Sequence, residues 1–336
     1  MNTTRRHFVK TLFVAGQATL LGRVLGADAF AEAPADPASL NFLVFGDWGV
    51  NGDPGQAQVA AQMAHAAART RAAFMLAAGD NFYEVGVKDV DDPQWQTSFE
   101  RVYAAESLQI PCYAILGNHD YCGNCEAQIE YGKLHPRWIM PARYYTQTHR
   151  IDERGTLQFF CIDTSPFVKE YHATPVLPPK PTDHDKRAFE AGQNMLANVS
   201  GQDTARQTGW LKDALSKSKA DWKIVVGHHP IYSGGVHGDQ PELVEQILPI
   251  LHQYGVHVYL CGHDHDLQHL QSDGIDFFCS GAGGAKLYPL HHTDETKYAV
   301  STFGFMSMTL TRDAMKVDLI DNLGKAVYQT TVHQTV

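Results

Sequence analysis

Five short apolar runs in this chain of 336 residues each end in a glycine followed by a residue that can bind a metal ion. The runs are NFLVF, AFMLAA, CYAIL, WKIVV and VYLC, and the residues after their glycines are Asp47, Asp80, Asn118, His228 and His263. Apolar runs of this length are typical of buried β-strands. One Gly-Asp or Gly-His pair is an ordinary turn, but five pairs with these residue types indicate a shared metal site.

Helical patterns separate the apolar runs and set the fold class. Segments 56–72, 206–218 and 241–254 have the spacing of helices, so the chain predicts an α/β fold in which helices connect buried strands. In such folds the functional side chains lie at the carboxyl ends of the strands, and glycine permits the tight turn that precedes them. Because the candidate ligands span positions 47 to 265, we expect one catalytic domain, residues 41–336.

Composition and charge limit the class of partner. The chain is 44% hydrophobic and 19% charged, which is typical of a globular protein with a substantial core. Its formal net charge of −10 argues against a nucleic acid as a steady partner. An anionic substrate would therefore need a local positive charge, which a bound metal would supply.

The first residues have the features of an export signal. Arg5 and Arg6 in TTRRHFVK precede an apolar stretch and small residues suited to cleavage. Residues 1–31 therefore look like a twin-arginine signal peptide before a Pro/Ala-rich linker, 32–40; a Sec signal or a membrane anchor is the alternative. Arg23 interrupts the apolar stretch, which argues against a membrane span. We expect the twin-arginine machinery to export the protein to the periplasm or the medium, without membrane insertion after signal removal.

The motifs at the ends of the apolar runs resemble a known family. GDWG (46–49), GDNFY (79–83), GNHD (117–120), GHHP (227–230) and GHDHDLQ (262–268) are similar in order and spacing to the metallophosphoesterase superfamily. Within it they resemble the small, mammalian-type purple acid phosphatases, also called tartrate-resistant acid phosphatases, over roughly residues 41 to 332. The resemblance implies an αββα sandwich with two mixed β-sheets flanked by helices.

The resemblance also implies a pair of unlike metal ions. It assigns Asp47, Tyr83 and His265 to Fe(III), Asp80 to a bridge between the ions, and Asn118, His228 and His263 to a divalent ion, which is Fe, Zn or Mn. Many related phosphodiesterases have Asp-x-His at the first motif, whereas Gly49 occupies the histidine position here. A phenolate and carboxylates are hard oxygen donors that suit a trivalent ion.

The last motif also contains residues outside this ligand set. His263 and His265 alternate along the turn, so that each is expected to reach a different ion. Asp264, Asp266 and His269 are expected at the surface, although either aspartate is able to orient a ligand imidazole.

An exported acid phosphatase is the function that these motifs indicate. Two metal ions can bind a phosphate oxygen and generate a hydroxide that attacks a phosphomonoester. His119 is the candidate general acid, with a structural role as the alternative. The family places a histidine near the substrate at the position of His237, which is equally consistent with a structural role; mammalian members have an acidic residue where this chain has Val236.

Two other functions remain open at this point. One is a phosphodiesterase or nucleotide hydrolase on the same fold, and the other is a secreted, iron-dependent redox or binding protein. We expect a phosphate-ester substrate, no nucleic-acid partner and a monomer.

The segment between Asp163 and Trp210 is rich in proline and turn residues. Structureless loops of this length are uncommon unless they are functional or disordered. We expect residues 166–204 to be either a lid over the site or an exposed insertion.

The six cysteines fall into two groups. Those inside apolar runs are expected to be buried: Cys112, Cys161, Cys261 and Cys279. Cys122 and Cys125 form a C-x-x-C pair next to the GNHD motif, for which we expect a local disulfide, with a redox switch or a zinc pair as alternatives.

Overall fold

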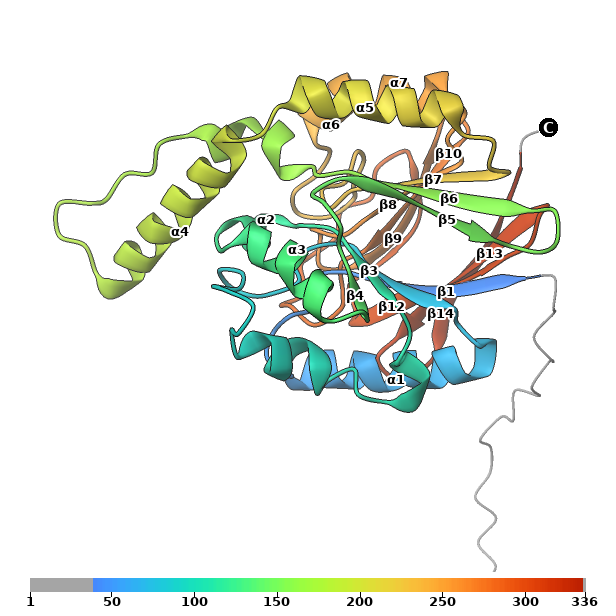
Figure 1. Ribbon diagram of the computed structural model, residues 1–336, viewed down its shortest axis with the longest axis horizontal. Helices are drawn as coiled ribbons and strands as arrows, with labels where there is room; N and C mark the ends of the chain where they lie inside the picture. Colours follow the sequence, from blue (N-terminus) through green and yellow to red (C-terminus); the bar gives the residue numbers. More distant parts are fainter. Residues whose placement is uncertain (1–38, 335–336) are drawn as a thin grey trace, which may run out of the picture. The chain divides into compact units, whose positions relative to one another are not determined.

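Two seven-stranded β-sheets packed face to face make up the centre of the computed structural model, which describes residues 39–334 (Figure 1). The predicted signal peptide and almost all of the predicted linker lie outside the described residues. The described residues all belong to one compact unit.

The first sheet has the strand order β14-β13-β12-β1-β2-β3-β4. These strands are β1 (Leu40–Phe45), β2 (Phe74–Ala77), β3 (Cys112–Ala114), β4 (Trp138–Ile139), β12 (Gly304–Leu310), β13 (Ala314–Asp321) and β14 (Ala326–His333). Strands β1 to β4 are parallel, whereas β12, β13 and β14 add an antiparallel half that begins at β1. The sheet is therefore mixed.

The second sheet has the strand order β11-β9-β10-β8-β7-β6-β5. Its strands are β5 (Tyr145–Arg150), β6 (Thr156–Cys161), β7 (Trp222–Val226), β8 (Val258–Cys261), β9 (Leu267–Ser272), β10 (Ile275–Ser280) and β11 (Thr296–Val300). Strands β6, β7, β8 and β10 are parallel, and the remaining strands pair antiparallel at both edges.

Three apolar layers hold the sheets and helices together. The central layer lies between the sheets and contains Phe42 and Phe74 from the first sheet and Phe159 from the second. A second layer packs α1 (Pro54–Thr70), α3 (Cys125–Leu134) and the helical turn η1 (Trp95–Glu100) on the first sheet. A third layer packs α5 (Thr204–Lys217), α6 (Pro241–Gln246) and α7 (Leu248–Gln253) on the second. The expected αββα sandwich is confirmed.

Each of the five apolar runs contains a strand of the parallel regions. They correspond to β1, β2, β3, β7 and β8, which are buried along their whole length or nearly so. The residues that follow the glycines therefore stand at the carboxyl edges of the two sheets. This edge is where α/β proteins place their functional groups.

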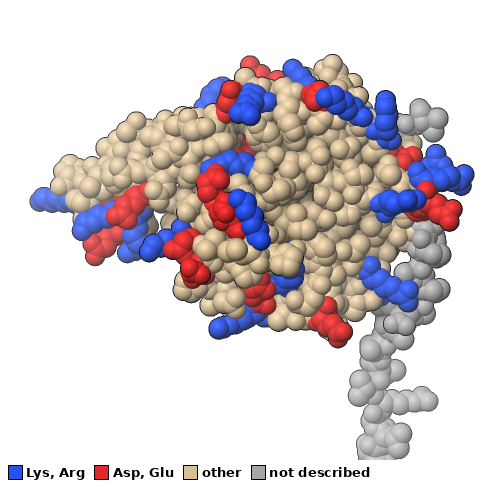
Figure 2. Space-filling model, in the orientation of Figure 1, with Lys and Arg blue, Asp and Glu red and all other residues tan. Residues whose placement is uncertain are grey.

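An arm projects from the second half of the sandwich. The segment expected to be a structureless loop instead contains the helical turns η3 (Ser165–Phe167) and η4 (Lys169–His172) and an 18-residue helix, α4 (Asp183–Ser200). Figure 1 shows α4 and the loop before it extending away from the sheets. On the face drawn in Figure 2, the arm carries acidic and basic side chains side by side. Thr182 caps α4 through a capping box, which explains why a helix follows the prolines.

None of the helices within residues 39–334 combines the length and apolar character needed to cross a membrane.

Candidate metal centre

Tyr83 lies at the centre of the first cluster of candidate ligands. Its phenol oxygen is 3.1 Å from Asp47 Oδ1, 2.9 Å from Asp80 Oδ2 and 3.0 Å from His265 Nε2. One ligand atom from each of Asp47, Asp80 and His265 lies within 4.8 Å of the others, and all three residues are buried. Four residues from three distant parts of the chain thus point polar atoms at one place.

Asn118 lies at the centre of the second cluster. Its Oδ1 is 3.0 Å from His228 Nε2 and 2.9 Å from His263 Nδ1. Asp80 Oδ2 is 3.4 Å from His228 Nε2 as well as 2.9 Å from the Tyr83 phenol. The same carboxylate oxygen therefore reaches both clusters, and the structure brings all seven predicted ligand residues together.

The hydrogen bonds of two histidines fit a metal site. His228 Nδ1 is 2.8 Å from the carbonyl of Ala78, and His265 Nδ1 is 2.6 Å from the carbonyl of Lys286. Because a carbonyl only accepts, each Nδ1 carries a hydrogen, and each Nε2 faces its cluster as the atom that would bind a metal ion. Fixing the tautomer through the far nitrogen is how proteins orient metal-binding imidazoles.

Backbone geometry at the site is unusual. Asp47, Asp80 and His263 have φ values of 58°, 48° and 71°, in the left-handed region that side chains other than glycine seldom adopt. Gly79 has φ 92°, and a Cβ there would lie 2.5 Å from His228 Nδ1. A glycine adopts the left-handed conformation at Gly79, as expected. After β1 and β8, the residues in this conformation are instead the candidate ligands Asp47 and His263. Such outliers concentrate at functional sites.

The electrostatics of the site favour a bound cation. Burial and the carboxylates of Asp47 and Asp80 raise the pKa of Tyr83 well above its usual value. Burial also raises the pKa of Asp47, whereas for Asp80 burial is outweighed by His228, His119 and His263 together, which lower the pKa. Among residues 39–334, the ion pairs of these two carboxylates are to histidines and not to lysine or arginine. A cation would compensate the buried oxygens, so the donor set fits a metal pair.

His119 stands beside the first cluster. Its ring centroid is 4.3 Å from that of Tyr83, and its backbone N–H donates to Asp80 Oδ1 at 2.8 Å. Its Nδ1 lies 2.6 Å from the carbonyl of Glu84 and therefore carries a hydrogen. The ring is half-buried, so its Nε2 atom is accessible and can exchange a proton with a molecule bound at the centre.

His237 lies over the second cluster. Its ring centroid is 4.2 Å from that of His263, and its side chain is 40% exposed. Val236, next to it, is also exposed. Both predicted catalytic histidines are therefore adjacent to the candidate ligands.

Three residues of the last motif are not where we expected them. Asp264, Asp266 and His269 were expected at the surface, but all three are buried. His269 lies on β9, an interior strand, and its ring contacts Tyr328 Oη at 2.9 Å and Asp276 Oδ1 at 2.7 Å. The expectation failed because polarity alone does not reveal that β9 has a neighbour on each side.

The sequence reasoning also missed two supporting residues. Asp120 accepts hydrogen bonds from the backbone of Gly117 and Asn81 and from the Gln128 side chain, which ties the Asp80 and Asn118 loops together. His229 lies between Thr164 Oγ1 (2.8 Å) and the Tyr171 phenol (3.0 Å), and so joins the centre to η4. Both residues could have been noticed from the sequence, because Asp120 lies in the GNHD motif and His229 lies in the GHHP motif, each close to a candidate ligand.

Cys122 and Cys125 are free thiols in the structure, so the expected disulfide is absent from it. The Cys122 thiol donates to the carbonyl of Asn118, and Cys125 is buried.

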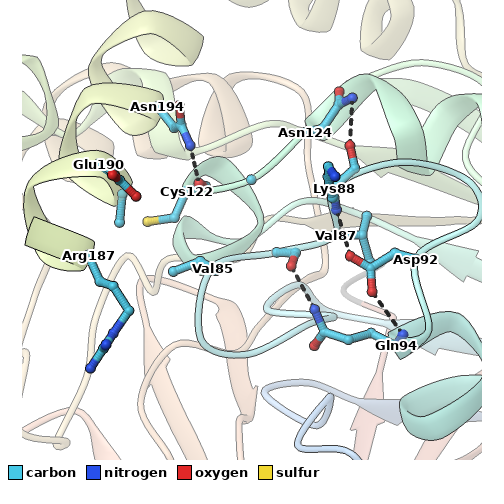
Figure 3. Close-up of a pocket in the computed structure, with 13 residues that line it drawn as sticks. Val85, Val87, Lys88, Asp92, Gln94, Cys122, Asn124, Arg187, Glu190 and Asn194 are labelled. Atoms are coloured by element: carbon cyan, nitrogen blue, oxygen red, sulfur yellow. Dashed lines mark hydrogen bonds between the residues drawn. The ribbon is translucent and has the colours of Figure 1, made fainter. Parts of the chain in front are cut away.

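Cys122 also lines a cavity of about 490 Å³ between α4 and the loop after Tyr83 (Figure 3). The Asn194 side chain donates a hydrogen bond to the backbone carbonyl of Cys122 there. The four cysteines in the apolar runs are buried, as expected.

Known proteins are similar in sequence to most of the chain. Residues 40–267 match the family described as calcineurin-like phosphoesterase. Purple acid phosphatase 7 of Arabidopsis thaliana is 37% identical over 300 residues, which cover 88% of this chain and 86% of that protein. Human tartrate-resistant acid phosphatase type 5 is 34% identical over 322 residues, with coverage of 88% and 91%.

Solved structures are similar in fold. The protein GAP50, titled the anchor in the inner membrane complex of Plasmodium, superposes with a TM-score of 0.73 at 25% identity and covers 89% of this chain and 90% of its own. Purple acid phosphatase PPD1 from yellow lupin superposes with a TM-score of 0.63 at 15% identity, with coverage of 89% and 55%.

Proposed function

This chain belongs to the purple acid phosphatases within the calcineurin-like phosphoesterase family, and we propose that it hydrolyses phosphomonoesters at a centre of Fe(III) and a divalent ion. It is an enzyme of the acid phosphatase class, and its family implies a dinuclear metal centre. The observation that carries the proposal is the convergence of the seven predicted ligands, with the Tyr83 phenol in contact with Asp47, Asp80 and His265.

Each side chain has a place in the proposed centre. Asp47, Tyr83 and His265 would hold Fe(III), Asp80 would bridge the ions, and Asn118, His228 and His263 would hold divalent Fe, Zn or Mn. When bound, such a pair supplies positive charge to a phosphate group and lowers the pKa of water. The phenol of Tyr83 is the donor that favours a trivalent ion on its side.

His119 and His237, which are partly exposed, would contact the substrate. Since the carbonyl of Glu84 holds the Nδ1 hydrogen of His119, a ring protonated at both nitrogens would give its Nε2 proton to the departing alkoxide and become the neutral Nδ1–H form. His237 would contact the phosphate group from the opposite cluster.

Kinetics on two matched substrates test this function. The purified, metal-loaded protein should hydrolyse 4-nitrophenyl phosphate at least about tenfold faster than bis(4-nitrophenyl) phosphate, since a pair of cations attracts the doubly charged monoester more strongly than the singly charged diester. Asp80→Asn should lose this activity, whereas Asp213→Asn, on the exposed face of α5, should keep it. Faster diester hydrolysis would favour the phosphodiesterase alternative.

The same experiment separates this hydrolysis from a purely binding role, for which the precedent is GAP50, a protein of similar fold that is described as an anchor. Metal-dependent hydrolysis that disappears in Asp80→Asn would exclude it. A protein that binds metal but hydrolyses neither substrate would support it.

We also propose export to the periplasm or the medium by the twin-arginine route, because Arg5 and Arg6 precede an apolar stretch in the sequence. Replacing both residues with lysine should retain the protein in the cytoplasm of an expressing bacterium. Equal export of both forms, measured by fractionation and immunoblot, would contradict this route.

A further inference from the structure

Asp264 is a buried carboxylate whose oxygens point away from the candidate ligands on either side of it in the sequence. The residue is fully buried. Its Oδ2 accepts a hydrogen bond from the Ser233 hydroxyl, and its Oδ1 lies 2.8 Å from His237 Nδ1 and 3.1 Å from the His237 backbone N–H. Within residues 39–334, every hydrogen bond of this carboxylate therefore goes to the loop that carries His237.

The contact fixes which ring atom His237 presents. A carboxylate that receives the backbone N–H and the Ser233 hydroxyl acts as an acceptor, so His237 Nδ1 carries a hydrogen toward it. The ring lies over His263 and has an edge-to-face contact with Tyr288 at 5.4 Å. With Nδ1 turned to the buried carboxylate, Nε2 is on the exposed edge of the ring.

The loop is shaped to sit on Asp264. A Cβ on Gly235 would lie 2.2 Å from Asp264 Cγ, so a larger residue would push the loop off the carboxylate. Gln268 supports the arrangement from β9: its Oε1 accepts from the Gly234 N–H at 2.8 Å, and its Nε2 donates to Ser233 Oγ at 3.0 Å. The buried polar side chains of Asp264 and Gln268 therefore determine the position of the loop that carries His237.

We propose that Asp264 is the positioning residue of His237: it accepts the Nδ1 hydrogen and thereby places Nε2 over the metal centre, where the ring, protonated at both nitrogens, donates a hydrogen bond to an oxygen of the phosphoryl group. This inference rests on the proposed phosphatase function. It differs from a role for Asp264 in supporting the ligands, because the carboxylate contacts the His237 loop and not an imidazole of His263 or His265.

Variants of Asp264 separate positioning from general support. Asp264→Ala should lower kcat/KM for a phosphomonoester about tenfold or more, the scale of one hydrogen bond to a charged group. Asp264→Asn should retain activity within about threefold, since its carboxamide oxygen still accepts from Nδ1–H. Ser233→Ala is the matched control, because it removes the hydroxyl contact of the carboxylate and keeps the two contacts to His237. Metal content should be equal in all variants.

A double-mutant cycle shows whether Asp264 acts through His237. If it does, Asp264→Ala should cost less than about twofold when it is added to His237→Ala, because the two changes remove one interaction. Multiplicative losses, or a fall in metal content that accounts for the loss, would overturn the proposal.

Nitrogen NMR of the histidine rings gives a readout that does not depend on turnover. With ¹⁵N-labelled histidine, the His237 signals, identified by their loss in His237→Ala, should show a hydrogen on Nδ1 in wild type and Asp264→Asn. Asp264→Ala should show a mixture of tautomers, and unchanged signals would overturn the proposal. If the wild type hydrolyses no phosphate ester, the proposed function fails, while the NMR result still decides whether Asp264 positions the ring.

Discussion

The ring of each histidine assigned a proton-transfer or phosphate-binding role is held at one nitrogen by an oxygen of the fold. A backbone carbonyl faces Nδ1 of His119, and a buried carboxylate faces Nδ1 of His237. The rings of His228 and His265 are held by carbonyls in the same way. The fold therefore selects Nε2 as the working atom in all four, which lowers the cost of organising the site when a ligand arrives.

Replacing His119 tests the role of its Nε2 atom. If His119 protonates the leaving group, His119→Ala should reduce kcat for an alkyl phosphate by about 10²–10⁴-fold but affect 4-nitrophenyl phosphate far less, since nitrophenolate leaves without a proton. Steady-state kinetics on both esters measure this, with the surface variant His252→Ala as the control. Equal losses on the two esters would show that His119 is structural.

At the scale of secondary-structure elements, the sequence predicts the buried strands better than it predicts the segments that connect them. The β1, β2 and β8 sequences are apolar except for Asn41 because both faces are covered, so composition alone reveals them. Helix α4 was missed because prolines and polar residues precede it and because only its Met195 and Val199 are buried. Burial of Asp264 was missed for a related reason, since the residues that cover it come from the distant Ser233–His237 loop.

The loop of residues 173–182 should be the first site of proteolytic cleavage. It has no helix or strand and joins η4 to α4 at the end of the arm, and its Val176 is 86% exposed. Limited proteolysis followed by mass spectrometry would locate the cut.

A clean cut there also distinguishes a lid from an exposed insertion. Because the arm extends away from the sheets, we expect turnover and metal content to stay within about twofold of the uncut protein. A large rise in turnover would favour the lid, and a first cut elsewhere would contradict the accessibility argument.

At the scale of the whole molecule, two sheets hold a buried cluster of charged side chains at the candidate metal centre. In the metal-free protein, burial lowers the pKa of His228, but the carboxylate of Asp80 outweighs this and raises it to about 10 from 6.5. The folded state then keeps a proton that the unfolded chain releases above 6.5. This contribution to stability is complete below pH 6.5 and is lost as the pH rises toward 10.

The free energy of unfolding of the metal-free protein should therefore fall between pH 7 and 9. The contribution of His228 is at most about 1.4 kcal/mol per pH unit. Urea unfolding at several pH values measures the slope, which should be shallower in His228→Gln and unchanged in the surface variant His252→Gln. Equal slopes in wild type and His228→Gln would contradict the assignment.

Metal content and colour test the centre itself. The protein should bind about two metal ions per chain, at least one of them iron. A phenolate bound to Fe(III) absorbs visible light by charge transfer, so the oxidised wild type should be purple or pink. Tyr83→Phe should lose the band while remaining folded, whereas Tyr171→Phe, whose phenol contacts His229 instead, should keep it. An iron-loaded, oxidised wild type without a visible band, or Tyr83→Phe with the band unchanged, would contradict a Tyr83–Fe(III) centre.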